Sequence, residues 1–304
     1  MQLIYNGTDI TDDVDIVKCV HRDVSGGKCD LLEIELENAN AWYRWQPQRD
    51  DVLIAVQNGY DTGAMYLNSV LPEAGRYKIL ATSIPSAARR KAYASYENIR
   101  LGDLLATCAA ECGMSSALYG ALDDCAYTYL ERNNESAPAF ISRILGMEGA
   151  ILKTINGKMV GISIKYAQDL AAQTIAIQAD QTGARYLRRE EKKLAGITLC
   201  TPYAMGTAQD RDASWGLTET HADYPAMDNA QAGRWARGLL LSRNRLAEEL
   251  TLEMEFTPLL TAMGRIDIES ATDAAGEWLV EEAEHDLFGG KSTARLVRCI
   301  RTIE

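Results

Sequence analysis

The sequence predicts an α+β fold that is rich in β-strands, with two β-rich units flanking a small α/β unit. Three observations support this class. Aliphatic and charged residues alternate through 1–84, as they do in half-buried strands. Apolar residues then recur at helical spacing in two stretches of 85–165. Strand-like alternation returns in 166–304, together with one further helix. We therefore expect domains at 1–84, 85–165 and 166–304.

The clearest strand of the first unit lies at 30–37, where aliphatic and acidic residues alternate. The two sets are Leu32, Ile34 and Leu36 against Glu33, Glu35 and Glu37. Period two places the aliphatic side chains on a buried face and the carboxylates on the opposite face. The same pattern recurs through Val52, Ile54 and Val56, and again through Tyr77, Ile79 and Ala81. Turn residues separate these runs, so we expect about six short strands.

The middle unit contains two helices and a hairpin. The first helix begins near Arg100 and ends at Gly113, and its apolar stripe includes Cys108 and Cys112. We expect both cysteines in the core. Ser136 can cap the second helix, which carries Pro138 in its first turn. The hairpin spans 150–165 around the turn Asn156-Gly157.

The last unit combines strands with one helix, expected from Ala230 to about Arg243. Its clearest strand alternates apolar and polar residues at 250–256, and its last strand runs through Val297. A polar stretch from 205 to 228 is expected to be a long surface excursion.

Composition excludes several classes of protein. The chain has 304 residues and 33.5 kDa, of which 47% are hydrophobic and 24% charged, so it folds rather than staying disordered. Its net charge of −12 repels phosphate backbones, which argues against sequence-specific nucleic-acid binding. No apolar run approaches the roughly 20 residues of a membrane span. The first seven residues lack the pattern of a secretory signal, so synthesis and assembly in the cytoplasm are expected.

Motifs that could carry chemistry are weak. The segment 288–293 is similar to part of a phosphate-binding loop, but His285 replaces the first Gly and strand pattern follows, which indicates a hairpin turn. The three histidines are scattered, and the group at 282–286 is expected to be a solvated strand end rather than a metal site. Seven scattered cysteines form no C-x-x-C pair. Paired acids, such as Asp123 and Asp124, leave a glycosidase arrangement open. We predict no catalytic, cofactor-binding or metal-binding residues.

The segment 42–47 contains Trp42, Trp45 and Pro47 between two strands. Two interpretations remain open. The rings could cover the end of a barrel, or Trp42 and Trp45 could form a partner interface, since Trp, Tyr and Arg are enriched at interface hot spots.

The order of these pieces resembles the baseplate hub proteins of contractile phage tails and related injection systems, including R-type bacteriocins. The opening 5–11 is similar to their first hairpin, and 28–37 to their strand of alternating acidic and aliphatic residues. The segment 42–56 resembles their tryptophan–proline turn, although Asp51 stands where a Gly is expected. The closest similarity covers 129–149. The similarity is weakest between about 166 and 228. Further similarities lie at 101–113, 230–246 and 278–285.

This resemblance implies a structural role without enzymatic activity or cofactors. Such hubs are homotrimers in which each chain supplies two tube-type, β-barrel-like domains. Six such domains form a ring that adapts the sixfold tail tube to the threefold spike. The implied partners are further copies of the chain, the tail spike protein, the tail tube protein and other baseplate proteins. The implied location is a virion tail baseplate or a bacteriocin particle. The acidic balance suits a conduit through which DNA or a tube passes without adhering.

Two alternatives belong to other classes. A tail-tip enzyme that degrades peptidoglycan would need a His/Cys pair or paired carboxylates in one cleft, and the sequence contains no motif for either. A carbohydrate-binding receptor protein would need an exposed aromatic row, which an aromatic content of 7% does not favour.

Overall fold

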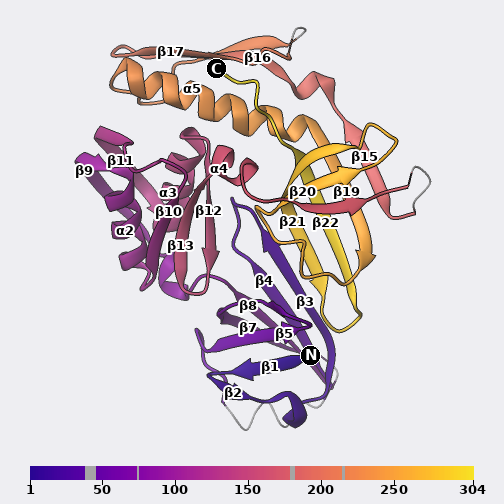
Figure 1. The fold of residues 1–304 in the computed structure, drawn as a ribbon. Helices are drawn as coiled ribbons and strands as arrows, with labels where there is room; N and C mark the ends of the chain where they lie inside the picture. Colours follow the sequence, from indigo (N-terminus) through magenta and orange to yellow (C-terminus); the bar gives the residue numbers. More distant parts are fainter. Residues whose placement is uncertain (38–45, 74, 179–181, 214–215) are drawn as a thin grey trace.

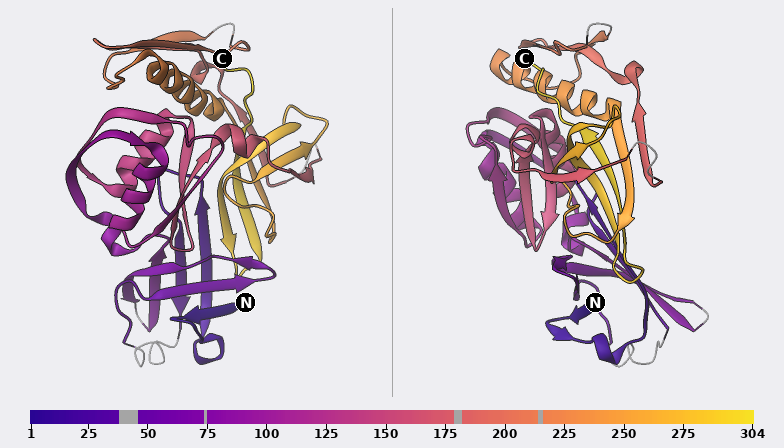
Figure 2. Two further views of the ribbon diagram at one scale, coloured as in Figure 1. Left: turned by 60° about the vertical axis from the view of Figure 1, so that its left-hand side comes forward. Right: turned by 45° about the vertical axis from the view of Figure 1, so that its right-hand side comes forward.

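The computed structural model describes residues 1–37, 46–73, 75–178, 182–213 and 216–304. It is a β-rich α+β fold, as the sequence predicts. The N-terminal strands lie at one end of the molecule, and helix α5 (Asn229–Asn244) lies at the other, above the α/β elements (Figure 1). A large sheet runs between the two ends. The views in Figure 2 show that this sheet and the α/β elements stand side by side.

The N-terminal strands form the first part of the large sheet. They are β1 (Gln2–Tyr5), β2 (Thr8–Asp9), β3 (Ile16–Val24), β4 (Leu31–Leu36), β5 (Val52–Gln57), β6 (Tyr60–Asp61), β7 (Met65–Glu73) and β8 (Arg76–Thr82). The alternation predicted for 30–37 is confirmed, because Leu32, Ile34 and Leu36 are fully buried. They share one core with the buried residues of β1, β5 and β8, which this alternation positions on a common face.

Strand β5 presents the opposite face to the one that the sequence predicts. Leu53 and Ala55 are fully buried, whereas Val52 and Ile54 are half-buried. The expected burial of Val52, Ile54 and Val56 is therefore wrong. The strand reads Val-Leu-Ile-Ala-Val, and with apolar residues on both faces its alternation carries no information on which face meets the core.

The middle unit packs three helices against two small sheets. The helices are α2 (Leu101–Glu111), α3 (Ala137–Met147) and α4 (Ile164–Gln168). The strands are β9 (Lys91–Arg100), β10 (Ser115–Tyr119), β11 (Ala126–Ser136), β12 (Ala150–Ile155) and β13 (Lys158–Ser163). Strand β9 pairs with β11, and β13 lies between β10 and β12. Both predicted helices and the predicted hairpin are confirmed.

Local sequence signals account for these elements. The Ser136 hydroxyl accepts a hydrogen bond from the amide of Ala139 and so caps α3. Asn156 and Gly157 both have positive φ, at 51° and 68°, as a two-residue turn of type I′ requires. The turn fixes the register of the hairpin, in which Ile155 pairs with Lys158.

The core position of Cys108 and Cys112 gives a labelling prediction. Both side chains are buried, and burial raises the pKa of Cys108 to about 12 and of Cys112 to about 11. Since the thiolate is the reacting form, both should resist maleimide labelling in the native protein and react after denaturation. Exposed Cys200 is the internal control and should react rapidly. Rapid native labelling of Cys108 and Cys112, measured by mass spectrometry of peptides, would place α2 at the surface.

The C-terminal strands complete the large sheet. They are β14 (Gln173–Ala176), β15 (Ala184–Arg188), β19 (Glu248–Glu255), β20 (Arg265–Glu269), β21 (Gly276–Asp286) and β22 (Lys291–Arg298). Strands β21 and β22 form a hairpin whose turn contains Phe288 and Gly290, so the predicted hairpin at 288–293 is confirmed. Hairpin backbone does not cradle phosphate as a helix N-terminus does.

The stretch 205–228 differs from the expected surface excursion. It contains β17 (Met205–Gln209) and β18 (Leu217–His221), which flank β16 (Leu194–Cys200) in a separate three-stranded sheet. This sheet covers α5 (Figure 1). Small residues in β17, including Gly206, allow the helix backbone to approach closely. Strands β17 and β18 are five residues long and expose Met205 and Leu217 beside polar residues, so they do not have the apolar alternation by which strands are recognised.

Close backbone packing joins α5 to the end of α3 and gives a second prediction. A Cβ added at Gly238 would lie 2.1 Å from the carbonyl oxygen of Met147 and 2.3 Å from the amide nitrogen of Gly149. Gly238→Ala should therefore destabilise the protein by at least about 1–3 kcal/mol, as overpacking does. Gly233, on the same helix, has open space at its Cβ position. Gly233→Ala should be neutral or stabilising by up to about 1 kcal/mol. Equal urea midpoints for the two variants would contradict this packing.

Candidate functional surfaces

The two β-rich parts of the chain form one continuous sheet. Strand β3 from the N-terminal part pairs antiparallel with β21 from the C-terminal part, in a register that places His21 opposite His285. The main strand path therefore runs from β15 through β21 and β3 to β2 without interruption. Residues more than 250 positions apart in sequence are neighbours along this join, for example Arg22 and Glu284.

One face of this sheet carries a ladder of cross-strand ion pairs, which we call the paired face. Its residues come from β8, β4, β3, β21, β22 and β19. The N–O distances are 2.6 Å for Lys18–Glu33, 3.7 Å for Lys18–Glu35, 2.8 Å for Lys78–Glu33, 3.3 Å for Arg22–Glu282, 2.5 Å for Arg22–Glu284, 3.8 Å for Arg295–Glu282 and 3.6 Å for Lys291–Glu253. The carboxylates expected on one face of 30–37 thus meet basic side chains from neighbouring strands.

Electrostatic effects on the paired face agree with this geometry. The hydrogen bond to Glu33 raises the pKa of Lys18, and the hydrogen bond to Glu284 raises the pKa of Arg22. Partial burial opposes ionisation of Glu33, but hydrogen bonds from Lys18 and Lys78 lower its pKa overall. Each such exposed pair stabilises a fold by only about 0–1 kcal/mol. Their main consequence is that the basic side chains are neutralised in place.

The opposite side of the join is buried and holds two histidines. The Nε2 atom of His285 donates to the carbonyl oxygen of Leu260 at 2.8 Å, and its Nδ1 atom lies 2.9 Å from the hydroxyl of Ser292. Burial lowers the pKa of His285 and lowers that of His21 to about 3, so both rings are neutral at pH 7. The expected solvated strand end at 282–286 is therefore wrong for His285, because β21 has β3 and β22 on its two sides.

A buried lysine attaches the α/β elements to the sheet. Lys153 on β12 donates to both carboxylate oxygens of Asp30 at 2.6 Å, and also to Asp23 and to the carbonyl oxygen of Val24. The side chains of Lys153, Asp23 and Asp30 are less than a tenth exposed. Burial raises the pKa of Asp30 to about 6, since desolvation and the charge of Asp23 outweigh the attraction of Lys153. The ammonium group is the positive charge that offsets these two carboxylates.

A second buried charge attaches α5 to the α/β elements. The Glu148 side chain, which is 2% exposed, follows the end of α3. It accepts hydrogen bonds from the indole nitrogen of Trp235 at 2.8 Å, from Arg234 at 3.1 Å and from the Tyr127 hydroxyl at 3.1 Å. One carboxylate therefore satisfies donors from β11 and from α5.

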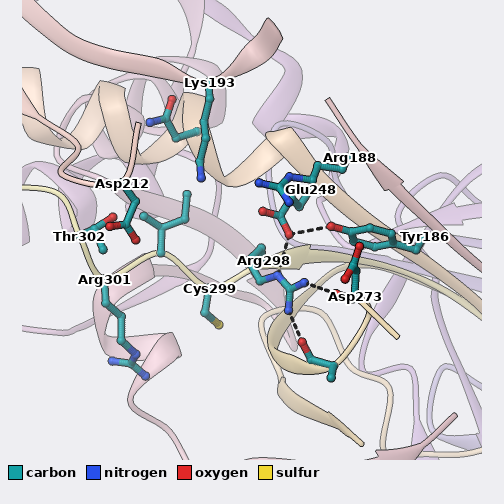
Figure 3. A pocket seen from close by; sticks show the side chains of 13 residues that line it. Tyr186, Arg188, Lys193, Asp212, Glu248, Asp273, Arg298, Cys299, Arg301 and Thr302 are labelled. Atoms are coloured by element: carbon teal, nitrogen blue, oxygen red, sulfur yellow. Dashed lines mark hydrogen bonds and ion pairs between the residues drawn. The ribbon is translucent and has the colours of Figure 1, made fainter. Parts of the chain in front are cut away.

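A cavity of about 370 Å³ lies beside β15, β19 and β22 (Figure 3). In it, Arg298 donates to Glu248 at 2.9 Å and stacks on Trp278, with 4.1 Å between the guanidinium carbon and the ring centre. Burial raises the pKa of Cys299 to about 12, so its thiol is protonated at neutral pH. The lining contains no histidine to act as a base. The Arg298 guanidinium is thus held between the Glu248 carboxylate and the Trp278 ring.

The residues predicted as an interface cannot be placed, because Trp42 and Trp45 lie outside the described residues. Among the residues that the structure describes, no group of three His, Cys, Asp or Glu side chains could hold a metal ion, and no helix has the length and apolar character needed to cross a membrane. Sequence reasoning missed Lys153 and Glu148. Lys153 could have been noticed as the single charged residue of a mostly apolar strand.

Solved structures of phage tail proteins have the same fold. A 43 kDa tail protein of prophage MuSo2 from Shewanella oneidensis matches with a TM-score of 0.70 and 9% identity, covering 98% of this chain and 97% of that chain. A tail protein from Neisseria meningitidis matches with a TM-score of 0.75 and 11% identity, covering 98% and 95%. An Escherichia coli component of the type VI secretion system, described as similar to T4 tail proteins gp27 and gp5, matches with a TM-score of 0.60 and 11% identity, covering 99% and 78%.

No protein-family model and no curated protein sequence matches the chain. The likeness to the solved structures extends over almost the whole chain at 9–11% identity, so what it establishes is the fold. The resemblance that the sequence motifs indicate is confirmed at that level. This chain has the fold of phage tail proteins and of their type VI secretion relatives.

Proposed function

We propose that the chain is the structural baseplate hub of a contractile tail and has no enzymatic activity. In this proposal it is a homotrimer that adapts the sixfold tail tube to the threefold spike. The observation that carries the proposal is the continuous sheet, which joins the N-terminal and C-terminal β-rich parts edge to edge. Two β units fixed in this way can present a repeated curved wall, and three chains would supply six units.

The proposed division into domains is the one expected from the sequence pattern. We propose tube-type, β-barrel-like domains at 1–84 and 166–304, with the α/β domain at 85–165 outside the ring. The main strand path ends at β15 and β2, whose outer edges would be exposed in a monomer. Ring closure protects such edges from unwanted pairing.

The proposed partners are further copies of the chain, the tail spike protein, the tail tube protein and other baseplate proteins. The proposed location is a virion tail baseplate or a bacteriocin particle. The paired face is the part of the sheet that suits the wall of a conduit, because its basic side chains are held by carboxylates and are not free to bind DNA.

This view of the paired face gives a DNA-binding prediction. The triple variant Glu33→Gln, Glu282→Gln and Glu284→Gln releases Lys78 and Arg22 from their partners and leaves Lys18 only its 3.7 Å contact with Glu35. Its affinity for a fluorescent DNA duplex at low salt should rise at least about tenfold, and should fall again as salt increases.

A matched control separates freed cations from changed net charge. The variant Asp12→Asn, Asp13→Asn and Glu97→Gln removes the same number of charges from exposed sites. It should bind DNA as weakly as the unmodified chain. If fluorescence anisotropy showed the same increase in DNA affinity for both triple variants, the ion pairs of the paired face would not be what prevents DNA binding.

The assembly itself is tested by native mass spectrometry. The chain should form a trimer of about 100 kDa, alone or when co-expressed with the product of the adjacent spike gene, by closed cyclic symmetry. A stable dimer, or a monomer even in the presence of the spike, would overturn the hub proposal.

A further inference from the structure

A group of exposed cations lies around the start of helix α3, and we call it the basic rim. It consists of Lys28, Arg89, Arg90 and Lys91, all of which are exposed. Arg89, Arg90 and Lys91 are consecutive, and the short 3-10 helix Ser86–Arg89 packs against α3. Lys28 lines a pocket together with Ile84 and with Pro138 at the start of α3. In the part of the chain that the structure describes, none of the four forms an ion pair, although most cations of this acidic protein do.

Three nearby carboxylates are engaged by other cations, and the Asp50 carboxylate accepts hydrogen bonds from Ser86. Glu111 pairs with Arg132 at 2.6 Å, and Glu135 pairs with Arg143 at 2.7 Å. Asp30 is buried against Lys153. Within the described residues, none of these carboxylates forms an ion pair with a cation of the basic rim, and the N-terminal end of the eleven-residue helix α3 adds a partial positive charge.

Two pockets lie on either side of this helix start. One, of about 460 Å³, is lined by Lys28 together with the apolar side chains of Ile84, Pro138 and Leu152. The other, of about 400 Å³, is lined by Arg90, Lys91, Tyr93 and Arg132 among others. Tyr93 is 73% exposed, and the Arg132 side chain is 1% exposed. Both pockets are large enough to admit a side chain, and both combine apolar walls with cations.

We propose that the basic rim is a docking surface for an acidic segment of another protein, with an apolar side chain that enters the pocket beside Leu152. Charge complementarity determines the sign of the partner's charge, because the exposed cations of the basic rim attract carboxylates even though the whole chain has a net charge of −12. The apolar pocket walls and exposed Tyr93 favour a peptide over nucleic acid, since Tyr and Arg are typical interface anchors. The proposal does not depend on the hub role.

The test is a phage-display selection of random 16-residue peptides against the unmodified chain. Enriched peptides should contain several Asp or Glu residues around an apolar residue. Their binding, measured by fluorescence anisotropy, should weaken at least tenfold in the variant Lys28→Glu, Arg89→Glu and Arg90→Glu.

A matched variant controls for net charge. Lys158→Glu, Arg185→Glu and Lys192→Glu reverses three other exposed cations that form no ion pair within the described residues, and should bind the peptides like the unmodified chain. Thermal unfolding of both variants confirms that each is folded. No enrichment, enrichment of non-acidic peptides, or equal weakening in the two variants would overturn the proposal. Tighter binding of a 16-nucleotide DNA oligonucleotide than of the selected peptides would overturn it as well.

Discussion

Replacement of Lys153 by Met is expected to destabilise the protein by about 3–5 kcal/mol. The substitution keeps most of the side-chain volume but leaves the carboxylates of Asp23 and Asp30 buried without their shared cation. Removal of one member of a buried ion pair costs about this much, because the remaining charge is not solvated. Urea unfolding followed by tryptophan fluorescence measures the loss.

Two controls make this result specific. Lys158→Met changes an exposed lysine of the same hairpin and should shift the urea midpoint little. Addition of Asp23→Asn and Asp30→Asn to Lys153→Met should restore part of the lost stability, since the buried charges are then absent. If Lys153→Met alone matched the exposed control, the buried pair would not anchor the α/β elements.

The stability deficit of Lys153→Met, which is its loss in free energy of unfolding relative to the unmodified chain, should also depend on pH. The folded-state pKa of Asp30, at about 6, is above its unfolded value of about 4. The stability associated with its protonation is therefore complete below about pH 4 and is lost as pH rises through 6. Without Lys153 the carboxylate is still harder to ionise. The deficit should be larger at pH 8 than at pH 5, and a constant deficit would contradict this coupling.

Replacement of Glu148 by Ala is expected to lower the free energy of unfolding by about 3–5 kcal/mol. It leaves the indole nitrogen of Trp235, the hydroxyl of Tyr127 and the guanidinium of Arg234 without their common acceptor. Unsatisfied buried donors cost about 1–3 kcal/mol each, and more when they are charged. Two of these three donors, Trp235 and Arg234, lie on α5. Amide hydrogen exchange should therefore accelerate most in α5.

The conservative variant Glu148→Gln distinguishes charge from hydrogen bonding. The amide oxygen can still accept from Trp235, so its cost should be smaller than that of Glu148→Ala. Glu97→Ala, an exposed substitution on β9, should be close to neutral. Uniform hydrogen exchange across the whole chain in Glu148→Ala would indicate a global effect and not a local attachment of α5.

Much of the local structure was predictable from the sequence alone, because it depends on short-range physics. The alternation at 30–37 determined a half-buried strand, and the cap at Ser136 and the turn Asn156-Gly157 determined where α3 and the hairpin begin and turn. The order of such motifs also indicated the fold of phage tail proteins, which the solved structures confirm. Each of these signals is contained within a few neighbouring residues.

Only the tertiary structure determined what joins the pieces. The buried face of β5, the strands within 205–228, and the pairing of β3 with β21 all depend on partners distant in the chain. The roles of Lys153 and Glu148 likewise come from donors and acceptors on other elements. Alternation in a strand that is apolar on both faces is ambiguous, and a buried charge is understood only with its counter-charge. The sequence therefore specifies elements, and long-range packing selects their faces and partners.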